Sequence, residues 1–158
     1  MKIIFLCHGN ICRSPMAEFI LKHKLEERHI DNIEVCSRAA HTDEIGSDMY
    51  PPAKRTLDAH GVRYTRRAAT LITQPDVDSA DLVLVMDDEN LYDIARRFGA
   101  NEKTKKLLTY VGSSRDVADP WYTRDFEQTY RDIDSACDAL LANEQRISTV
   151  IRDEPRTF

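Results

Sequence analysis

The sequence predicts an α/β fold of three layers, in which helices flank a four-stranded parallel sheet and an anion-binding loop follows the first strand. Short apolar runs without alternation are typical of strands that are buried on both faces. Between these runs, apolar residues recur at helical spacing, which favours a parallel sheet covered by helices. The chain has 158 residues, which suits one domain with a single core. We expect this domain to span 1–158, with its core at about 2–142 and a polar C-terminal tail.

The first predicted strand is the apolar run 3–6, and it leads into a loop at 7–13 that contains glycine and asparagine. Ser14 is expected to cap the next helix, and Pro15 suits its first position. Apolar residues at helical spacing extend this helix to about Arg28. The sequence therefore predicts a strand, a short polar loop and a helix in succession.

The middle of the chain repeats this alternation. The segment 33–36 is predicted to be the second strand, and 53–60 is predicted to be a helix that ends at a glycine. The third strand, 82–86, has the clearest apolar run. An acidic start and a terminal glycine then bound a helix at 87–98.

The last part of the chain is predicted to hold a short fourth strand at 106–108. A loop follows that carries Asp119, Pro120 and Trp121. Inward-facing apolar residues predict a helix over 126–141, and the chain after Asn143 is expected to be a polar tail. Ligands of such sheets bind beyond the carboxyl ends of the strands, where the loop 7–13 lies.

Composition narrows the classes of function. The formal net charge is −5, which disfavours a nucleic-acid binder. No apolar run is long enough to span a membrane, and no cleavage motif follows the N-terminal apolar stretch. We therefore expect a cytoplasmic protein without nucleic-acid or membrane partners. The four cysteines do not form the paired spacing of a structural zinc site, and in a reducing compartment they should be thiols.

Cys7 and Arg13 bracket the glycine-containing loop between the first strand and the first helix. The amides of such a loop point inward, and the helix dipole adds positive charge, so the loop is expected to bind an anion such as phosphate. Arg13 can clamp two phosphate oxygens. Within this positive field Cys7 is expected to be a thiolate and a nucleophile. A buried, inert cysteine is the alternative, and the loop and Arg13 argue against it.

Two further residues are expected to shape this loop. Ser14 can cap the helix and also donate its hydroxyl to the Cys7 sulfur. Asn10 tolerates left-handed geometry and hydrogen-bonds the backbone, so we interpret it as structural. The five histidines show no metal-ligand spacing, and we expect neither a metal nor a cofactor.

A thiolate that attacks a phosphate ester needs a second group to protonate the leaving oxygen. Asp119 lies in a loop before the last helix, from which it can reach the same cleft. Trp121 and Tyr122 can line a cleft for a flat aromatic ester and partly desolvate the acid. Packing against the last helix is the alternative role for these two aromatics.

The segment 7–18, with sequence CHGNICRSPMAE, closely resembles the active-site motif of the low-molecular-weight protein tyrosine phosphatases. The segment 119–122, DPWY, followed by 125–127, DFE, resembles the acid loop of the same family. The resemblance extends over about 2–142. It implies a four-stranded parallel sheet and a metal-free mechanism of two steps.

In that mechanism, by resemblance, Cys7 attacks phosphorus and forms a cysteinyl-phosphate. Arg13 and the loop residues hold the phosphate oxygens, and Asp119 first protonates the leaving phenol and then activates water. The phosphate-binding residues implied by the family are those of the loop and its first helical turn: His8, Gly9, Asn10, Ile11, Cys12 and Ser14.

Substrate choice is implied by finer features of the resemblance. Ile11 matches the tyrosine phosphatases of the family, whereas the related protein-arginine phosphatases carry threonine there. Asp43 and Glu44 are placed in the cleft wall, and many members have an aromatic residue where Asp43 stands. Cys12 matches members in which it forms a reversible disulfide with the nucleophile, which would protect Cys7 from irreversible oxidation.

The sequence therefore favours a protein tyrosine phosphatase whose partners are phosphotyrosine-containing proteins and phosphate or another oxyanion. We expect a monomer or weak dimer. A protein-arginine phosphatase is one alternative. An arsenate reductase of the same fold is another, although Cys36 and Cys137 lack a redox-pair spacing. A non-catalytic phosphate-binding or redox-sensing module is the alternative from a different class.

Overall fold

A computed structural model of the protein describes the backbone of residues 1–153 and the side chains of residues 1–144. The strands β1 (Lys2–Cys7), β2 (Glu34–Ala39), β3 (Leu82–Val85) and β4 (Thr104–Lys106) form one parallel sheet. Their order is β2-β1-β3-β4. The predicted four-stranded parallel sheet is therefore confirmed.

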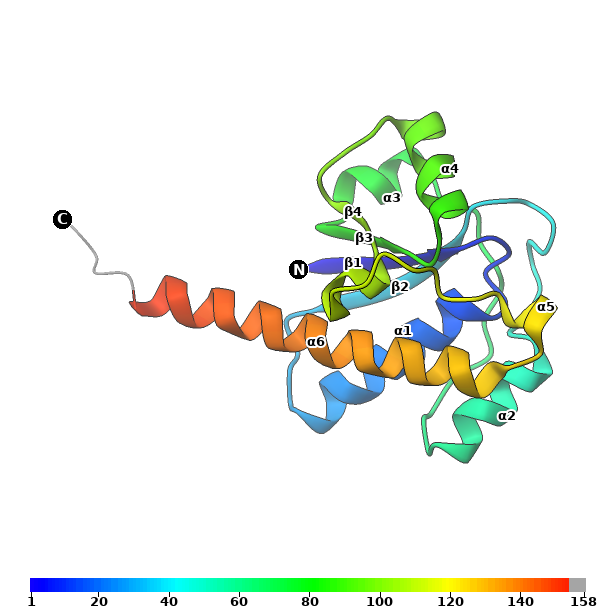
Figure 1. Cartoon of the computed structure of the whole chain (residues 1–158), viewed down its shortest axis with the longest axis horizontal. Coiled ribbons are helices and arrows are strands. Elements are labelled where there is room, and N and C mark those ends of the chain that lie inside the picture. The colour runs from blue at the N-terminus through cyan, green and yellow to red at the C-terminus, as the bar shows by residue number, and fades with distance from the viewer. Residues whose placement is uncertain (154–158) are drawn as a thin grey trace.

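Helices cover both faces of the sheet (Figure 1). One face packs against α1 (Arg13–Glu27), α2 (Pro51–Ala59) and α6 (Phe126–Asp153), and the opposite face packs against α3 (Gln74–Ser79) and α4 (Asp88–Phe98). Alternate residues of β1 serve the two faces. Ile3 and Phe5 belong to the core with α1 and α6, whereas Ile4 and Leu6 belong to the core with α3 and α4.

The order in which the chain adds strands to the sheet reverses at β1. The chain leaves β1 through α1 to reach β2 on one side, and β3 then pairs with β1 on the other side. In such sheets a crevice opens beyond the carboxyl ends of the strands at this point. The loop 7–13 occupies this position, immediately after β1.

The start of α1 differs from the prediction. The helix begins at Arg13, and its cap residue is Cys12 instead of Ser14. The Met16 amide donates to the Cys12 carbonyl, 3.1 Å away. Pro15 therefore sits among the first residues, whose amides have no partner within a helix, so its missing N–H costs nothing. The Ser14 hydroxyl is left free for a different bond.

Four short elements were missed or misplaced in the prediction. Only Lys106 of the predicted strand 106–108 is in β4, because the chain turns into the 3-10 helix η1 (Leu107–Val111). Helix α3 is bounded by a reciprocal cap between Thr73 and Asp76 that was overlooked. The segment expected to be a loop after Asp119 forms the one-turn helix α5 (Pro120–Thr123), which Asp119 caps.

Helix α6 is longer than predicted. The sequence placed its end near Leu141 and a polar tail after Asn143, but α6 continues to Asp153. The remainder of the predicted tail, 154–158, lies outside the described residues. Within residues 1–153, none of the helices has the length and apolar character needed to cross a membrane.

Candidate active site

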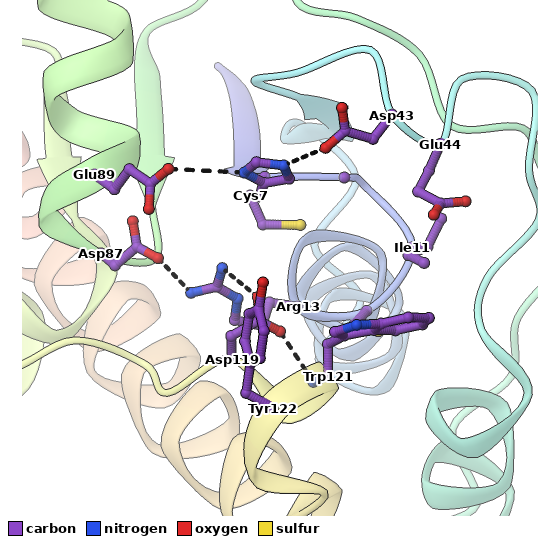
Figure 2. Close-up of a pocket in the computed structure, with 13 residues that line it drawn as sticks. Cys7, Ile11, Arg13, Asp43, Glu44, Asp87, Glu89, Asp119, Trp121 and Tyr122 are labelled. Carbon is purple, nitrogen blue, oxygen red and sulfur yellow. Dashed lines mark hydrogen bonds and ion pairs between the residues drawn. The ribbon is translucent and has the colours of Figure 1, made fainter.

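A pocket of about 440 Å³ lies beyond the carboxyl end of β1. The residues that form it come from four regions: the loop after β1, the loop after β2, the start of α4, and α5 (Figure 2). It brings the predicted Cys7, Arg13 and Asp119 together. Also lining it are the predicted His8, Gly9, Ile11, Cys12, Asp43, Glu44, Trp121 and Tyr122, together with Asp87 and Glu89.

Cys7 is almost fully buried, and its sulfur faces the first turn of α1. The Ser14 hydroxyl lies 3.0 Å from Cys7 Sγ, and the Ser14 amide donates to the same sulfur at 3.4 Å. A helix N-terminus carries partial positive charge, which stabilises a thiolate. Ser14 therefore contacts the candidate nucleophile with both of its donors, which explains why its hydroxyl does not cap the helix.

Arg13 is held on one side by fixed acceptors. Its Nη1 donates to Asp87 Oδ2 at 2.7 Å and to the Val117 carbonyl at 2.9 Å, while its Nη2 lies 3.4 Å from Asp119 Oδ2. Burial opposes the charged form, but the negative charges of Cys7, Asp87 and Asp119 raise the pKa of Arg13 above its usual value. The guanidinium is thus a permanent cation in the wall of the pocket.

Asn10 fixes the shape of the loop from beneath. It is fully buried and has a φ of 59°, the left-handed conformation that asparagine tolerates. Its Nδ2 donates to Ser14 Oγ at 2.8 Å and to Ser37 Oγ at 3.0 Å. Its Oδ1 accepts from the Thr70 amide and from Arg67 Nη2. Every polar atom of this side chain is therefore used.

Asp119 reaches the pocket from the opposite side to Cys7 (Figure 2). Its Oδ1 accepts from the Trp121 amide at 3.0 Å, which orients the carboxylate, and its Oδ2 is the atom near Arg13. About 28% of the side chain is exposed, so a proton can enter and leave. The aromatic rings of Trp121 and Tyr122 stand beside it at the mouth.

The tilt of Trp121 is set by residues outside the pocket. Its ring lies 4.9 Å from the ring of Tyr50, and the guanidinium of Arg124 lies 5.4 Å from its centre. Arg124 follows α5 in the left-handed conformation, with a φ of 60°. Arg124 therefore adopts a backbone conformation that favours glycine, and its guanidinium helps to hold the aromatic wall.

The mouth of the pocket is acidic. Asp43 and Glu44 follow β2, and Glu89 lies in the first turn of α4. Glu44 lies over Gly9: a β-carbon at Gly9 would come within 3.3 Å of Glu44 Cγ, so glycine allows this close approach. These carboxylates form a negatively charged rim above the positively charged floor.

Several residues of the site were not identified from the sequence. Asp87 was interpreted mainly as a helix-start acid, and it does cap α4 through the Asn90 amide. Its second oxygen binds Arg13, and its place at the end of β3 was the signal available. Arg67 and His41 have no local signal, because they reach the site only through the tertiary fold.

The cysteines differ in their surroundings. All four are free. Cys12 lines the pocket with Cys7. Its burial and the nearby charge of Cys7 raise the pKa of its thiol well above the usual value. Cys12 is therefore a protonated thiol beside the candidate nucleophile.

Comparison with known proteins identifies the family of the chain. The family model described as low molecular weight phosphotyrosine protein phosphatase matches residues 2–151. The low molecular weight protein-tyrosine-phosphatase PtpA of Staphylococcus saprophyticus is 34% identical over 142 residues, which cover 88% of this chain and 90% of that protein.

Solved structures give the same result. YfkJ from Bacillus subtilis superposes with a TM-score of 0.88 at 32% identity, covering 92% of this chain and 95% of that one. The Drosophila arginine phosphatase superposes with a TM-score of 0.84 at 27% identity, covering 91% and 98%. With a family match over nearly its whole length and a relative above 30% identity, the chain belongs to the low molecular weight phosphotyrosine protein phosphatase family.

Proposed function

We propose that this protein hydrolyses phosphotyrosine in other proteins through a cysteinyl-phosphate on Cys7. One observation carries the proposal: the Cys7 sulfur, the Arg13 guanidinium and the Asp119 carboxyl group converge on one pocket. Arg13 is held by Asp87, and Cys7 by Ser14. The three groups supply a nucleophile, an oxyanion clamp and a proton donor.

In the first step, the Cys7 thiolate attacks phosphorus in line with the ester bond. A sulfur–phosphorus bond forms as the bond from phosphorus to the tyrosine oxygen breaks. Arg13 and the loop amides of residues 8–13 hold the equatorial oxygens, where negative charge develops. Asp119, protonated at the start, gives its proton to the leaving phenolate oxygen.

In the second step, the Asp119 carboxylate removes a proton from a water molecule, which attacks the phosphorus of the intermediate. The sulfur–phosphorus bond breaks, inorganic phosphate leaves, and the Cys7 thiolate is restored. Asp119 recovers its proton in this step, so the cycle is balanced without a further reactant. The Ser14 donors stabilise the thiolate as it leaves.

Tyrosine is the preferred substrate side chain in this proposal. Trp121 and Tyr122 offer aromatic walls, and the side chain of Ile11, which also lines the pocket, is apolar. A guanidinium would need hydrogen-bond acceptors at that depth. Phosphoarginine remains the second candidate, because one structurally similar protein is an arginine phosphatase and the rim is acidic.

The test compares a phosphotyrosine peptide with a phosphoarginine peptide of the same sequence, in the presence of a chelator. We expect tyrosine turnover, none in Cys7→Ser, and a shift towards phosphoarginine in Ile11→Thr. A wild-type preference for phosphoarginine would preserve the mechanism and overturn the substrate. Turnover of neither would favour the arsenate reductase or the phosphate-binding module.

Redox protection of the nucleophile is part of the proposal. When peroxide oxidises Cys7 to a sulfenic acid, the Cys12 thiol displaces water and forms a disulfide, which a thiol reductant reverses. Peroxide inactivation should therefore be reversible in the wild type and irreversible in Cys12→Ser. The free cysteines suit the cytoplasm as the site of action, and we expect a monomer or weak dimer.

A further inference from the structure

Two histidines and a glutamate meet at the edge of the pocket. His8 belongs to the loop after β1, His41 follows β2, and Glu89 lies in the first turn of α4. One nitrogen of each ring and one oxygen of Glu89 all lie within 4.8 Å of one another. The two rings stack, with their centres 4.2 Å apart and their planes at 23°. Three separate segments thus present metal-binding atoms to one point.

Each ring is oriented by its own carboxylate. His8 Nε2 lies 2.6 Å from Asp43 Oδ2, and His41 Nε2 lies 2.8 Å from Asp93 Oδ2. Asp93 is buried, so His41 has a fixed partner. A carboxylate on one ring nitrogen, with the other nitrogen left for a metal, is the usual outer arrangement of histidine metal ligands. His8 Nδ1 is the atom that faces Glu89, at 3.9 Å.

The distances are within reach of coordination. Tetrahedral zinc with bonds of about 2.0–2.1 Å separates its ligand atoms by roughly 3.3 Å. The three ligand atoms now lie within 4.8 Å of one another, so each distance between them must shorten by about 1.5 Å at most. Glu89 has an exposed side chain that can rotate, and His8 and His41 are only half-buried. Closing the site therefore takes rotation of the Glu89 side chain and of the two imidazoles out of their stacked arrangement.

The charges also favour a cation. Around the two imidazoles stand three carboxylates, those of Asp43, Glu89 and Asp93. With neutral rings the cluster carries an excess of negative charge, which a divalent ion would reduce. Two imidazole nitrogens and one carboxylate oxygen form a donor set that suits zinc and leaves one position for water.

We propose that His8, His41 and Glu89 bind one Zn²⁺ ion at the mouth of the pocket. His8 and Glu89 both line the pocket, so the bound ion stands where a phosphorylated side chain enters. Zinc is then a reversible inhibitor that acts from the rim, separately from the Cys7 thiolate. The inhibition rests on the proposed phosphatase function, whereas the binding site does not.

Binding of Zn²⁺ to the chelator-treated full-length protein is the first measurement, by calorimetry or by competition with a chromophoric chelator. The wild type should bind one ion. His41→Gln, which keeps a donor towards Asp93, and Glu89→Gln on the exposed turn should each weaken binding at least about tenfold. His60→Gln is the matched control, because His60 pairs with Glu127 outside the pocket.

Cys7→Ser separates this site from simple thiolate binding. We expect this variant to keep its zinc affinity, and Co²⁺ bound to the wild type to lack a thiolate charge-transfer band. Wild-type affinity in both His41→Gln and Glu89→Gln, or loss of binding in Cys7→Ser, would overturn the proposal.

Inhibition tests the functional part. Zn²⁺ should inhibit phosphotyrosine hydrolysis by the wild type over the concentration range in which it binds. His41→Gln, with its rate expressed relative to its own zinc-free rate, should resist inhibition over that range. Equal inhibition of the two proteins would refute the rim mechanism. An inactive wild type that still binds zinc would refute the proposed function but retain the metal site.

Discussion

The floor and the rim of the pocket are built in different ways. By the floor we mean Cys7 and Arg13, which line the pocket, together with Asn10 and Ser14 directly beneath them; all four are at most 3% exposed. The rim includes Asp43, Glu89 and Tyr122, whose exposures exceed 60%. On the floor, each polar side chain has fixed partners, whereas the rim side chains come from separate elements and face solvent.

This difference separates chemistry from selection. Burial strengthens hydrogen bonds and the interactions between charges, so a small change on the floor is expected to alter the rate of the reaction itself. Exposed charges are screened by water and salt, so a change on the rim is expected to alter which substrate binds. Asp119 stands between the two regions, because it is partly exposed and yet contacts Arg13.

Among the variants compared below, Asp119→Asn should lower kcat the most. Asp119→Asn keeps an oxygen to cap α5 but cannot transfer the proton, so kcat should fall about 10²–10⁴-fold. The loss should shrink for substrates with more acidic phenols, which leave without protonation. Steady-state kinetics over a series of aryl phosphates measures this.

Asp116→Asn is the control for this prediction, because Asp116 lies just before Asp119 in the chain but outside the pocket lining. Its activity should match that of the wild type. A loss for Asp119→Asn that does not depend on the leaving group would contradict its role as the acid.

Loss of the Ser14 hydroxyl should have the next largest effect. Ser14→Ala removes a buried contact 3.0 Å from Cys7 Sγ and leaves Asn10 Nδ2 without one acceptor. The loss should raise the activation free energy by roughly 1.5 kcal/mol, which corresponds to about a tenfold fall in kcat. Alkylation of Cys7 by iodoacetate should slow as well. Ser37→Ala, two hydrogen bonds further from the sulfur than Ser14, should cost less. An equal or larger loss would contradict the gradient.

A change on the rim should affect substrate preference by a small factor. Glu44→Gln removes one half-buried charge above Gly9 and keeps the shape of the side chain. The KM for phosphopeptides with neighbouring lysines should rise about two- to threefold at low salt, and kcat should stay constant. Peptides with neighbouring glutamates provide the comparison. A fall in kcat for both would place Glu44 with the floor.

The floor could be predicted from the sequence because its residues are close together in the sequence. Cys7, Asn10, Arg13 and Ser14 lie in one strand–loop–helix segment, where local geometry determines what a side chain can contact. Even so, the prediction that Ser14 caps α1 was wrong. The helix already begins at Arg13, after Cys12, and the Ser14 hydroxyl instead contacts the Cys7 sulfur and the Asn10 amide group.

The rest of the site depends on contacts between distant segments. Arg67 reaches Asn10, and His41 stacks on His8, through tertiary packing that has no periodic signal. Helix α5 was missed for a different reason, because its signal is local. The pair Asp119–Pro120 was placed in a loop, although an aspartate cap followed by proline also starts a helix.

Asp48 provides the mildest test, because it supports the floor from outside the pocket. Its carboxylate accepts from Lys54 Nζ at 2.6 Å and from the amides of Met49 and Arg67, and Arg67 in turn binds Asn10. Desolvation opposes the charged form, but these hydrogen bonds lower the pKa of Asp48 to about 2.

Since the folded pKa of Asp48 lies below its ordinary value, the stability it contributes is present above about pH 4 and is lost as the pH falls towards 2. Asp48→Asn should therefore cost about 1 kcal/mol at pH 7, or about 2–4 °C in Tm. It should also flatten the fall in Tm between pH 4 and pH 2. Thermal unfolding over this range measures both effects. An unchanged acid slope in the variant would show that the bonds of Asp48 do not support the segment that holds Asn10 in place.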